Sequence, residues 1–242
     1  MKRNLEDIQG SRFFGRRHGK VLSPARKGRM EHYLPLYRIE EARDNIHSVA
    51  DYFAMEESSH DQGYRQYWLE IGFGKGEHLA WQAAHNRDVG IIGCEPFING
   101  VSGLVDEIDE RELSNVRIFM DDARLMMDSL PTEGLDRAFI LFADPWPKFR
   151  HHKRRIVNEG NLRELARILK DGAELRIATD HLDYCHWIMA HMMRAAEFEW
   201  INDSVSDWAI RGDDWPQTRY EEKAGREGRL SRYMRFRRRE RG

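Results

Sequence analysis

The sequence has almost no cysteine. Of its 242 residues only Cys94 and Cys185 are cysteines, and both lie in apolar stretches. They form no CxxC pair and no spacing typical of metal ligands, which argues against a disulfide-stapled or cysteine-ligated zinc protein. We therefore expect both to be reduced core residues of a cytoplasmic protein.

Long apolar runs are also missing. None approaches the ~20 residues that a membrane-spanning helix needs, and the N-terminus lacks the apolar centre of a signal peptide. The eleven histidines include no HxxxH with a supporting acid, so no metal site is predicted. We expect a protein with no membrane partner and no bound metal.

Net charge is the third thing that the sequence lacks. The formal sum is only -2, so the molecule as a whole is not built to attract a polyanion. The distribution is uneven, however: nine lysines and arginines lie between residues 2 and 29, eight arginines lie between 226 and 241, and acids are concentrated between these ends. Basic stretches of this kind are compatible with nucleic-acid binding.

What is present indicates one large α/β domain. The chain is 40% hydrophobic, which is enough for a core. We predict a flexible basic arm over 1–35, a folded domain over 36–242, and a helix over 37–55. Strands are predicted at 67–71, 90–94, 116–120, 138–142, 174–178 and 232–237. Helices are predicted at 77–84, 97–108, 123–130, 159–169 and 182–196. This alternation favours a mostly parallel sheet between two helical layers.

Acids stand where these predicted strands end. They are Glu70, Glu95, the pair at 121–122, Asp144 and Asp180. Any one of them could simply cap a helix. Five at one edge are hard to explain by packing, because acids are poor strand residues and costly to bury unpaired. Ligands of open α/β sheets lie outside the carboxyl ends of the strands, so this edge is the predicted binding site.

A glycine loop follows the first of these strands. Gly72, Gly74 and Gly76 let the backbone approach a ligand closely. The spacing is neither the GxGxxG of dinucleotide-binding folds nor a Walker loop, which favours a nucleoside without a phosphate chain. Glu95 lies about 20 residues further on, where an acid can accept both ribose hydroxyls. Asp122 could take an adenine amino group.

The stretch Asp144-Pro-Trp-Pro147 ends the apolar run at 138–142. Proline cannot donate to a sheet ladder, so the strand must stop, and Asp144 sits on a stiff corner. A stiff acid beside Trp146 suits a flat, hydrogen-bonding ligand such as a nucleobase. The basic run 148–155 follows directly. A strand-end turn with a solvated charge run is the alternative interpretation.

Taken together, these motifs resemble those of two known groups of proteins, one of which lies within the other. Glu70-Ile-Gly-Phe-Gly-Lys-Gly76 with Glu95 resembles the S-adenosylmethionine site of Rossmann-like class I methyltransferases, which implies a seven-stranded sheet. Together with Asp144-Pro-Trp-Pro-Lys148, the His-Lys-Arg-Arg at 152–155, Thr179-Asp180 and Thr218-Arg-Tyr-Glu221-x-Lys223, it resembles the bacterial tRNA (guanine-N7)-methyltransferases over about 35–240.

The resemblance implies methyl transfer from S-adenosyl-L-methionine to N7 of the variable-loop guanosine at tRNA position 46, leaving S-adenosyl-L-homocysteine. It assigns the cofactor site to Glu70, Gly72, Glu95, Asp122 and Asp144, with Asp144 also catalytic. It implies substrate contacts at Lys148, Asp180, Thr218, Arg219, Tyr220 and Glu221. It implies RNA contacts at Arg150, His151, His152, Lys153, Arg154 and Arg155.

The chemistry of guanine agrees with this assignment. N7 carries a lone pair and no proton at neutral pH, so the enzyme must mainly align it with the methyl group. Asp144 would hold and stabilise the base, although action as a general base stays open. Trp146 and Tyr220 are candidates to hold a base taken out of its stack, and each could equally be a packed core aromatic.

Three alternatives remain from the residues alone. A methyltransferase of similar fold acting on a small molecule is disfavoured by the basic runs. A nucleic-acid-binding protein with a dead cofactor site is disfavoured by the intact acids and glycines. A dehydrogenase is disfavoured by the missing GxGxxG and tyrosine-lysine relay. A monomer is favoured over a dimer only weakly.

Overall fold

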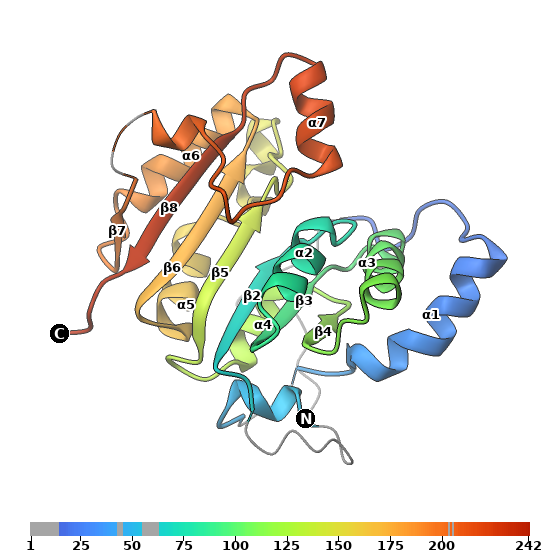
Figure 1. Ribbon diagram of the computed structural model, residues 1–242. Coiled ribbons are helices and arrows are strands. Elements are labelled where there is room, and N and C mark those ends of the chain that lie inside the picture. The colour runs from blue at the N-terminus through green and yellow to red at the C-terminus, as the bar shows by residue number, and fades with distance from the viewer. Residues whose placement is uncertain (1–14, 43–45, 55–62, 203, 205) are drawn as a thin grey trace.

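In the computed structural model, the chain folds around one eight-stranded sheet (Figure 1). The structure describes residues 15–42, 46–54, 63–202, 204 and 206–242. The strands lie in the order β1-β4-β3-β2-β5-β6-β8-β7. Their bounds are β1 Arg38–Ile39, β2 Gln66–Ile71, β3 Val89–Cys94, β4 Val116–Phe119, β5 Leu135–Leu141, β6 Leu169–Thr179, β7 Phe198–Trp200 and β8 Arg232–Arg238. Neighbours are parallel from β1 to β6, and β8 is antiparallel to both β6 and β7.

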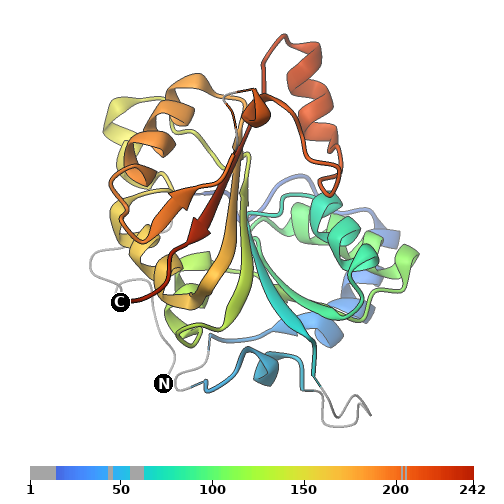
Figure 2. The same cartoon turned by 60° about the vertical axis from the view of Figure 1, so that its left-hand side comes forward.

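Helices cover both faces of this sheet (Figure 2). One layer holds α1 (Pro24–Tyr37), α2 (Glu77–His85) and α3 (Ile98–Arg111). The other holds α4 (Ala123–Ser129), α5 (Glu159–Ile168) and α6 (Leu182–Met192). Each layer buries its own cluster of apolar side chains against the sheet. A further helix, α7 (Arg219–Arg226), projects from the end of the sheet where β6 finishes (Figure 1).

The predicted α/β alternation is confirmed, with corrections at the edges. The sheet has eight strands, not seven, because the two-residue β1 pairs with β4. The helix predicted over 37–55 is wrong where the structure describes it: β1 is followed by a single 3-10 turn, Val49–Tyr52. The apolar spacing is satisfied by that turn, which buries Val49, Tyr52 and Phe53. The side chain of Arg117 fixes its end by donating to the carbonyls of Tyr52 and Phe53.

Part of the predicted flexible arm is a helix. Ser23 caps α1 and Pro24 opens it, which is a favourable start for a helix. The helix lies along α3, where Arg29 binds Asp106 at 2.6 Å. Met30 is buried there. Residues 1–14 of the predicted arm lie outside the described residues.

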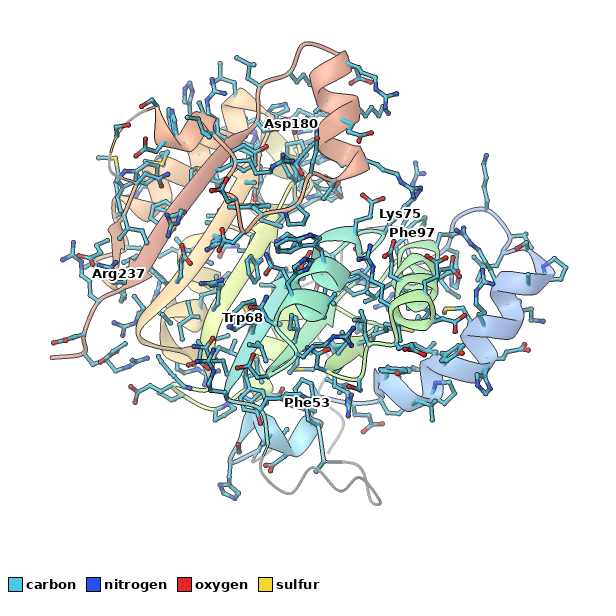
Figure 3. All side chains as sticks on the ribbon, viewed as in Figure 1. Phe53, Trp68, Lys75, Phe97, Asp180 and Arg237 are labelled. Carbon is cyan, nitrogen blue, oxygen red and sulfur yellow. The ribbon has the colours of Figure 1, made fainter. Side chains whose placement is uncertain are left out.

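The parallel strands bring their carboxyl ends to one edge of the sheet. The chain winds from β2 out to β3 and β4, and β5 then returns to the other side of β2. Figure 3 shows Asp180 at the same end of the sheet as Lys75 and Phe97, while Phe53 lies at the opposite end. The point where strand order reverses is where open α/β sheets bind ligands.

Candidate active site

A cavity of about 850 Å³ opens at this reversal of strand order. The glycine loop after β2 and the segments that follow β3, β4 and β5 all contribute to its walls. Four residues that the sequence predicts for the cofactor site line it: Gly72, Glu95, Asp122 and Asp144. The structure therefore brings together four residues that are up to 72 positions apart in the chain, three of them acids.

The glycine loop presents bare backbone to this cavity. Gly72 and Gly74 have φ values of 74° and 56°, which side chains disfavour. A Cβ on either residue would meet no atom within 4 Å. The loop is held by Glu95, whose carboxylate accepts hydrogen bonds from the backbone N–H of Gly74 and of Phe97, each at 3.0 Å.

Glu95 keeps acceptor capacity for a ligand. Each carboxylate oxygen has two lone-pair sites, and the two backbone bonds use one on each oxygen. Burial raises the pKa of Glu95, and the charge of Asp144 adds to this, while the two N–H donors oppose it. The remaining sites can accept hydroxyl donors from the cavity.

Asp122 has two roles in the structure. It is the N-cap of α4, since Oδ1 accepts from the N–H of Arg124 at 2.9 Å. The Arg124 guanidinium also binds both of its oxygens, at 2.9 and 2.7 Å. Asp122 thus does cap a helix, which was the alternative explanation for each strand-end acid, and it also lines the cavity.

Glu70 does not line the cavity, in contrast to its predicted place in the cofactor site. Its side chain meets His78 of α2, with Oε2 2.7 Å from Nδ1. Both residues are buried. A buried carboxylate needs such a partner, and the pair links the end of β2 to α2 on the two sides of the glycine loop.

Asp144 stands on a strained corner. It is exposed, and within the part of the chain that the structure describes, no protein group hydrogen-bonds to its carboxylate. A bulky residue lies two positions before Asp144 and another two positions after it: Phe142 and Trp146, with φ values of 52° and 43°. Such conformations cost about 1–3 kcal/mol each and collect at functional sites.

Arg155 fixes this corner from inside the protein. Its Nε donates to the carbonyl of Pro145 at 2.8 Å, and its guanidinium forms an ion pair with Asp183 of α6. The residue is 1% exposed. It is therefore not available to touch RNA in this structure, which differs from its predicted role.

The rest of the basic run forms a 3-10 helix, η3 (Phe149–Arg154), outside the corner. Lys148, Arg150 and Lys153 are exposed. The guanidinium of Arg154 lies 4.9 Å over the ring of Trp146, and His151 meets the same ring at 5.9 Å. The adjacent arginines 154 and 155 thus differ, with Arg154 outside the corner and Arg155 within it.

Asp180 is already paired within the protein. Its carboxylate forms an ion pair with Arg229 and accepts a long hydrogen bond from the hydroxyl of Tyr220, at 3.5 Å. The Tyr220 ring packs 5.2 Å from Phe142. The structure thus brings the predicted substrate residues Asp180 and Tyr220 together, outside the cavity walls.

The motif at 218–221 builds the start of α7. Thr218 and Glu221 form a capping box, in which each side chain binds the other's backbone N–H. Glu221 is buried and also accepts from the hydroxyl of Tyr233 at 2.6 Å. The N–H of Arg219 donates to Glu77, the first residue of α2, at 2.7 Å. Helix α7 is therefore tied to the end of the glycine loop.

Sequence reasoning missed two contributors to the cavity. Gly15 and Arg16 line it, because residues 15–20 run along the start of α3. The carbonyl of Arg17 accepts from the N–H of Ile98 at 3.0 Å, and that of Lys20 accepts from Asn99 at 2.7 Å. A basic, glycine-containing segment carries no periodicity that would reveal this course.

Comparison with known proteins shows the family. The family model described as "Putative methyltransferase" matches residues 64–232. The chain is 44% identical over 227 residues to the tRNA (guanine-N(7)-)-methyltransferase of Zymomonas mobilis subsp. mobilis, covering 94% of each chain. It is 44% identical over 241 residues to that of Ruegeria pomeroyi, covering 98% of this chain and 99% of the relative. The chain belongs to the tRNA (guanine-N7)-methyltransferase family.

The fold places the chain in a wider group. The solved antibiotic-resistance methyltransferase Kmr superposes with a TM-score of 0.50 at 16% identity, covering 75% of this chain and 90% of that one. The sheet is thus that of the Rossmann-like class I methyltransferases, as predicted. Among the described residues there is no group of three or more histidines, cysteines and acids placed to hold a metal ion. None of the described helices has the length and apolarity to cross a membrane.

Proposed function

We propose that this chain transfers the methyl group of S-adenosyl-L-methionine to N7 of the guanosine at position 46, in the variable loop of tRNA. The observation that carries this is the cavity shared by Glu95, Asp122 and Asp144, with Lys153 and Arg154 of the basic run in its wall. A cofactor site and cations suited to RNA phosphates thus meet around one carboxylate.

The cavity suits S-adenosylmethionine on its own geometry. The open space above Gly72 and Gly74 admits a ligand against the backbone. Glu95 can accept the two ribose hydroxyls through its remaining lone pairs. Asp122 and Ala123 line the same cavity and are proposed to read the adenine edge. When bound, the cofactor supplies an electrophilic methyl group on a sulfonium sulfur.

Asp144 is proposed to hold the guanine. Its exposed carboxylate can accept from N1–H and the exocyclic amino group, which sets the direction of the N7 lone pair. Methylation makes the purine positive, and a carboxylate at that place stabilises the developing charge. N7 has no proton to lose, so the role needs no general base. The corner between Phe142 and Trp146, pinned by Arg155, keeps the carboxylate in place.

The tRNA backbone is proposed to lie along η3. Contacts to phosphates set affinity and position rather than base choice. The residues proposed for these contacts are Lys148, Arg150, His151, His152, Lys153 and Arg154. Asp180, Thr218, Arg219 and Tyr220 would bind substrate once Asp180 is released from Arg229. We further infer that the chain acts in the cytoplasm and as a monomer, which light scattering of the purified protein would test.

Methyl transfer from labelled S-adenosylmethionine to unmodified tRNA tests the proposal, with nucleoside analysis of the product. A second tRNA carries adenosine in place of guanosine 46. 7-Methylguanosine in the first tRNA alone supports the reaction, substrate and position. No labelled tRNA, despite binding of S-adenosylhomocysteine, would overturn the tRNA assignment and leave a small-molecule substrate.

A further inference from the structure

Phe149 is the most exposed aromatic residue in the part of the chain that the structure describes, at 88%. It is the first residue of η3, five residues after Asp144. Five residues span at most about 18 Å. A single exposed apolar side chain is ordinary on a protein surface, so its surroundings must decide whether this ring has a function.

These surroundings are cationic. The run 148–155 contains no acid, and its exposed side chains Lys148, Arg150 and Lys153 lie on both sides of the ring in sequence. Phe149 is the only apolar residue in that run. Nucleic acid offers both phosphates for the cations and flat bases for the ring, and so matches the composition of this run.

The ring has one ring neighbour among the described residues and is otherwise largely open to solvent. His152, one turn further along η3, meets it at 5.4 Å in an edge arrangement, and His152 itself rests 5.3 Å from Trp187 of α6. At 88% exposure most of the Phe149 side chain faces solvent and can receive a flat ligand. Ordering of a stacking surface before binding lowers the entropy lost when a ligand docks.

The two aromatic residues predicted from sequence to hold a base, Trp146 and Tyr220, are less open to a ligand than Phe149. Trp146 carries Arg154 over its ring at 4.9 Å and His151 at 5.9 Å. Tyr220 packs against Phe142 and hydrogen-bonds Asp180. Each would have to give up a protein contact to receive a base on that side.

We propose that Phe149 is a stacking platform for an unpaired tRNA base that neighbours the methylated guanosine. This rests on the proposed function and adds to it a contact that carries no charge. Stacking tolerates any base, since every base has a π-face. Phe149 therefore strengthens binding of the variable loop without selecting its sequence.

The test compares tRNA affinity of the wild type, Phe149→Leu, Phe149→Trp and Lys153→Ala by filter binding over a range of salt concentrations. Phe149→Leu keeps an apolar side chain without a π-face, and Phe149→Trp keeps the π-face. We expect Phe149→Leu to bind about fivefold or more weakly with an unchanged salt slope, and Phe149→Trp to bind as tightly as the wild type. Lys153→Ala should instead reduce the salt slope by about one.

A fluorescent base gives a direct readout. Two unmodified tRNAs carry 2-aminopurine on the 5′ or the 3′ side of guanosine 46. The wild type should quench one of them on binding, and Phe149→Leu should not. Phe149→Leu and Phe149→Trp should bind S-adenosylhomocysteine as the wild type does, which shows that the fold is kept.

Contrary outcomes separate the two proposals. If the wild type methylates tRNA but Phe149→Leu binds and quenches as the wild type does, the stacking proposal is overturned alone. If the wild type does not bind tRNA, both proposals fall. Binding to phosphatidylserine vesicles that depends on Phe149, with tRNA affinity unchanged, would assign the ring to a membrane surface instead.

Discussion

The two halves of the sheet's carboxyl edge differ in what their acids already bind. Beside the cavity, Glu95 accepts only two backbone N–H groups, and Asp144 faces solvent. Beside α7, Asp180 is paired with Arg229, and Glu221 binds Thr218 and Tyr233. We call the first the cavity half and the second the α7 half.

The difference shows how each half can receive a ligand. In the cavity half Glu95 and Asp144 offer acceptors without loss of a described protein contact, as a preorganised site does, whereas Asp122 is already bound by Arg124. In the α7 half a ligand must displace one of the protein's own groups, so binding there is linked to movement of α7. Changes in the two halves should therefore separate cofactor affinity, tRNA affinity and turnover.

The largest effect is expected at Asp144. Asp144→Asn keeps the size of the side chain and removes its charge. We expect kcat to fall about 10²- to 10³-fold, the loss typical when a group that stabilises transition-state charge is removed. Affinity for S-adenosylhomocysteine should fall much less than kcat, because Asp144 is proposed to act mainly on the guanine while Glu95 binds the ribose. Single-turnover methylation with saturating tRNA measures the first, and calorimetry measures the second.

Asp88→Asn is the matched control for this charge change. Asp88 lies before β3, at the opposite edge of the sheet, where it pairs with Arg65 on the surface. Turnover of Asp88→Asn should equal that of the wild type. Near-normal turnover of Asp144→Asn would refute both the positioning and the electrostatic role, and with them a general-base role.

The next largest effect is expected at Glu95, in cofactor affinity. Hydrogen bonds to a charged group contribute about 1.5–3 kcal/mol. Glu95→Gln should therefore weaken S-adenosylhomocysteine binding by about 10- to 150-fold and leave tRNA affinity in place. Burial raises the pKa of Glu95. On acidification, the affinity of the wild type for S-adenosylhomocysteine should therefore begin to fall at a pH above the usual pKa of glutamate, whereas the affinity of Glu95→Gln should not change with pH. Equal pH profiles for the two proteins would contradict the assignment.

The cavity half could be predicted from sequence because its determinants are local. Each strand is a short apolar run, and each acid or glycine follows directly in the chain. Topology then brings strand ends together without further information. Glu70 is the exception, since its partner His78 lies on the next helix and only the fold shows that the two side chains meet.

The α7 half could not be predicted in the same way. Helix α7 is eight residues long and buries only Glu221 and Ala224, so it has almost no apolar pattern. The two arginines at 154 and 155 look alike in a basic run, yet one lies inside the protein. Its partners, Pro145 and Asp183, are 10 and 28 residues away, and no local pattern identifies them.

A smaller effect should follow from loosening α7 itself. Thr218→Ala removes the N-cap, which costs about 1 kcal/mol. We expect faster hydrogen exchange in 219–226 and about a fivefold higher KM for tRNA, with unchanged binding of S-adenosylhomocysteine. Thr218→Ser keeps the capping hydroxyl and should behave as the wild type. Loss of cofactor affinity in Thr218→Ala would show that the two halves are not separable.

The smallest effect concerns the acid stability of the α7 half. The loop before α7 is held by Asp214, which binds Arg176 at 2.7 Å, and Arg176 also binds Glu174 at 3.0 Å. Burial by itself would raise the pKa of both acids, but the guanidinium groups outweigh it and lower each pKa. The pKa of each acid is therefore lower in the folded state than in the unfolded state. The ion pairs then contribute their full stability above the usual pKa range of carboxylates, and this stability is lost as the pH falls through the lowered pKa values of the folded state.

Urea unfolding of the wild type and Glu174→Gln at pH 7 and at successively lower pH tests this. The variant should be less stable at pH 7 and lose less stability on acidification, so the two curves converge. Hydrogen exchange near the midpoint should show α7 and its preceding loop opening before β2 and β3, because the core strands are held by apolar burial that does not titrate. Simultaneous opening of both regions would mean that these ion pairs do not hold the α7 half separately from the cavity half.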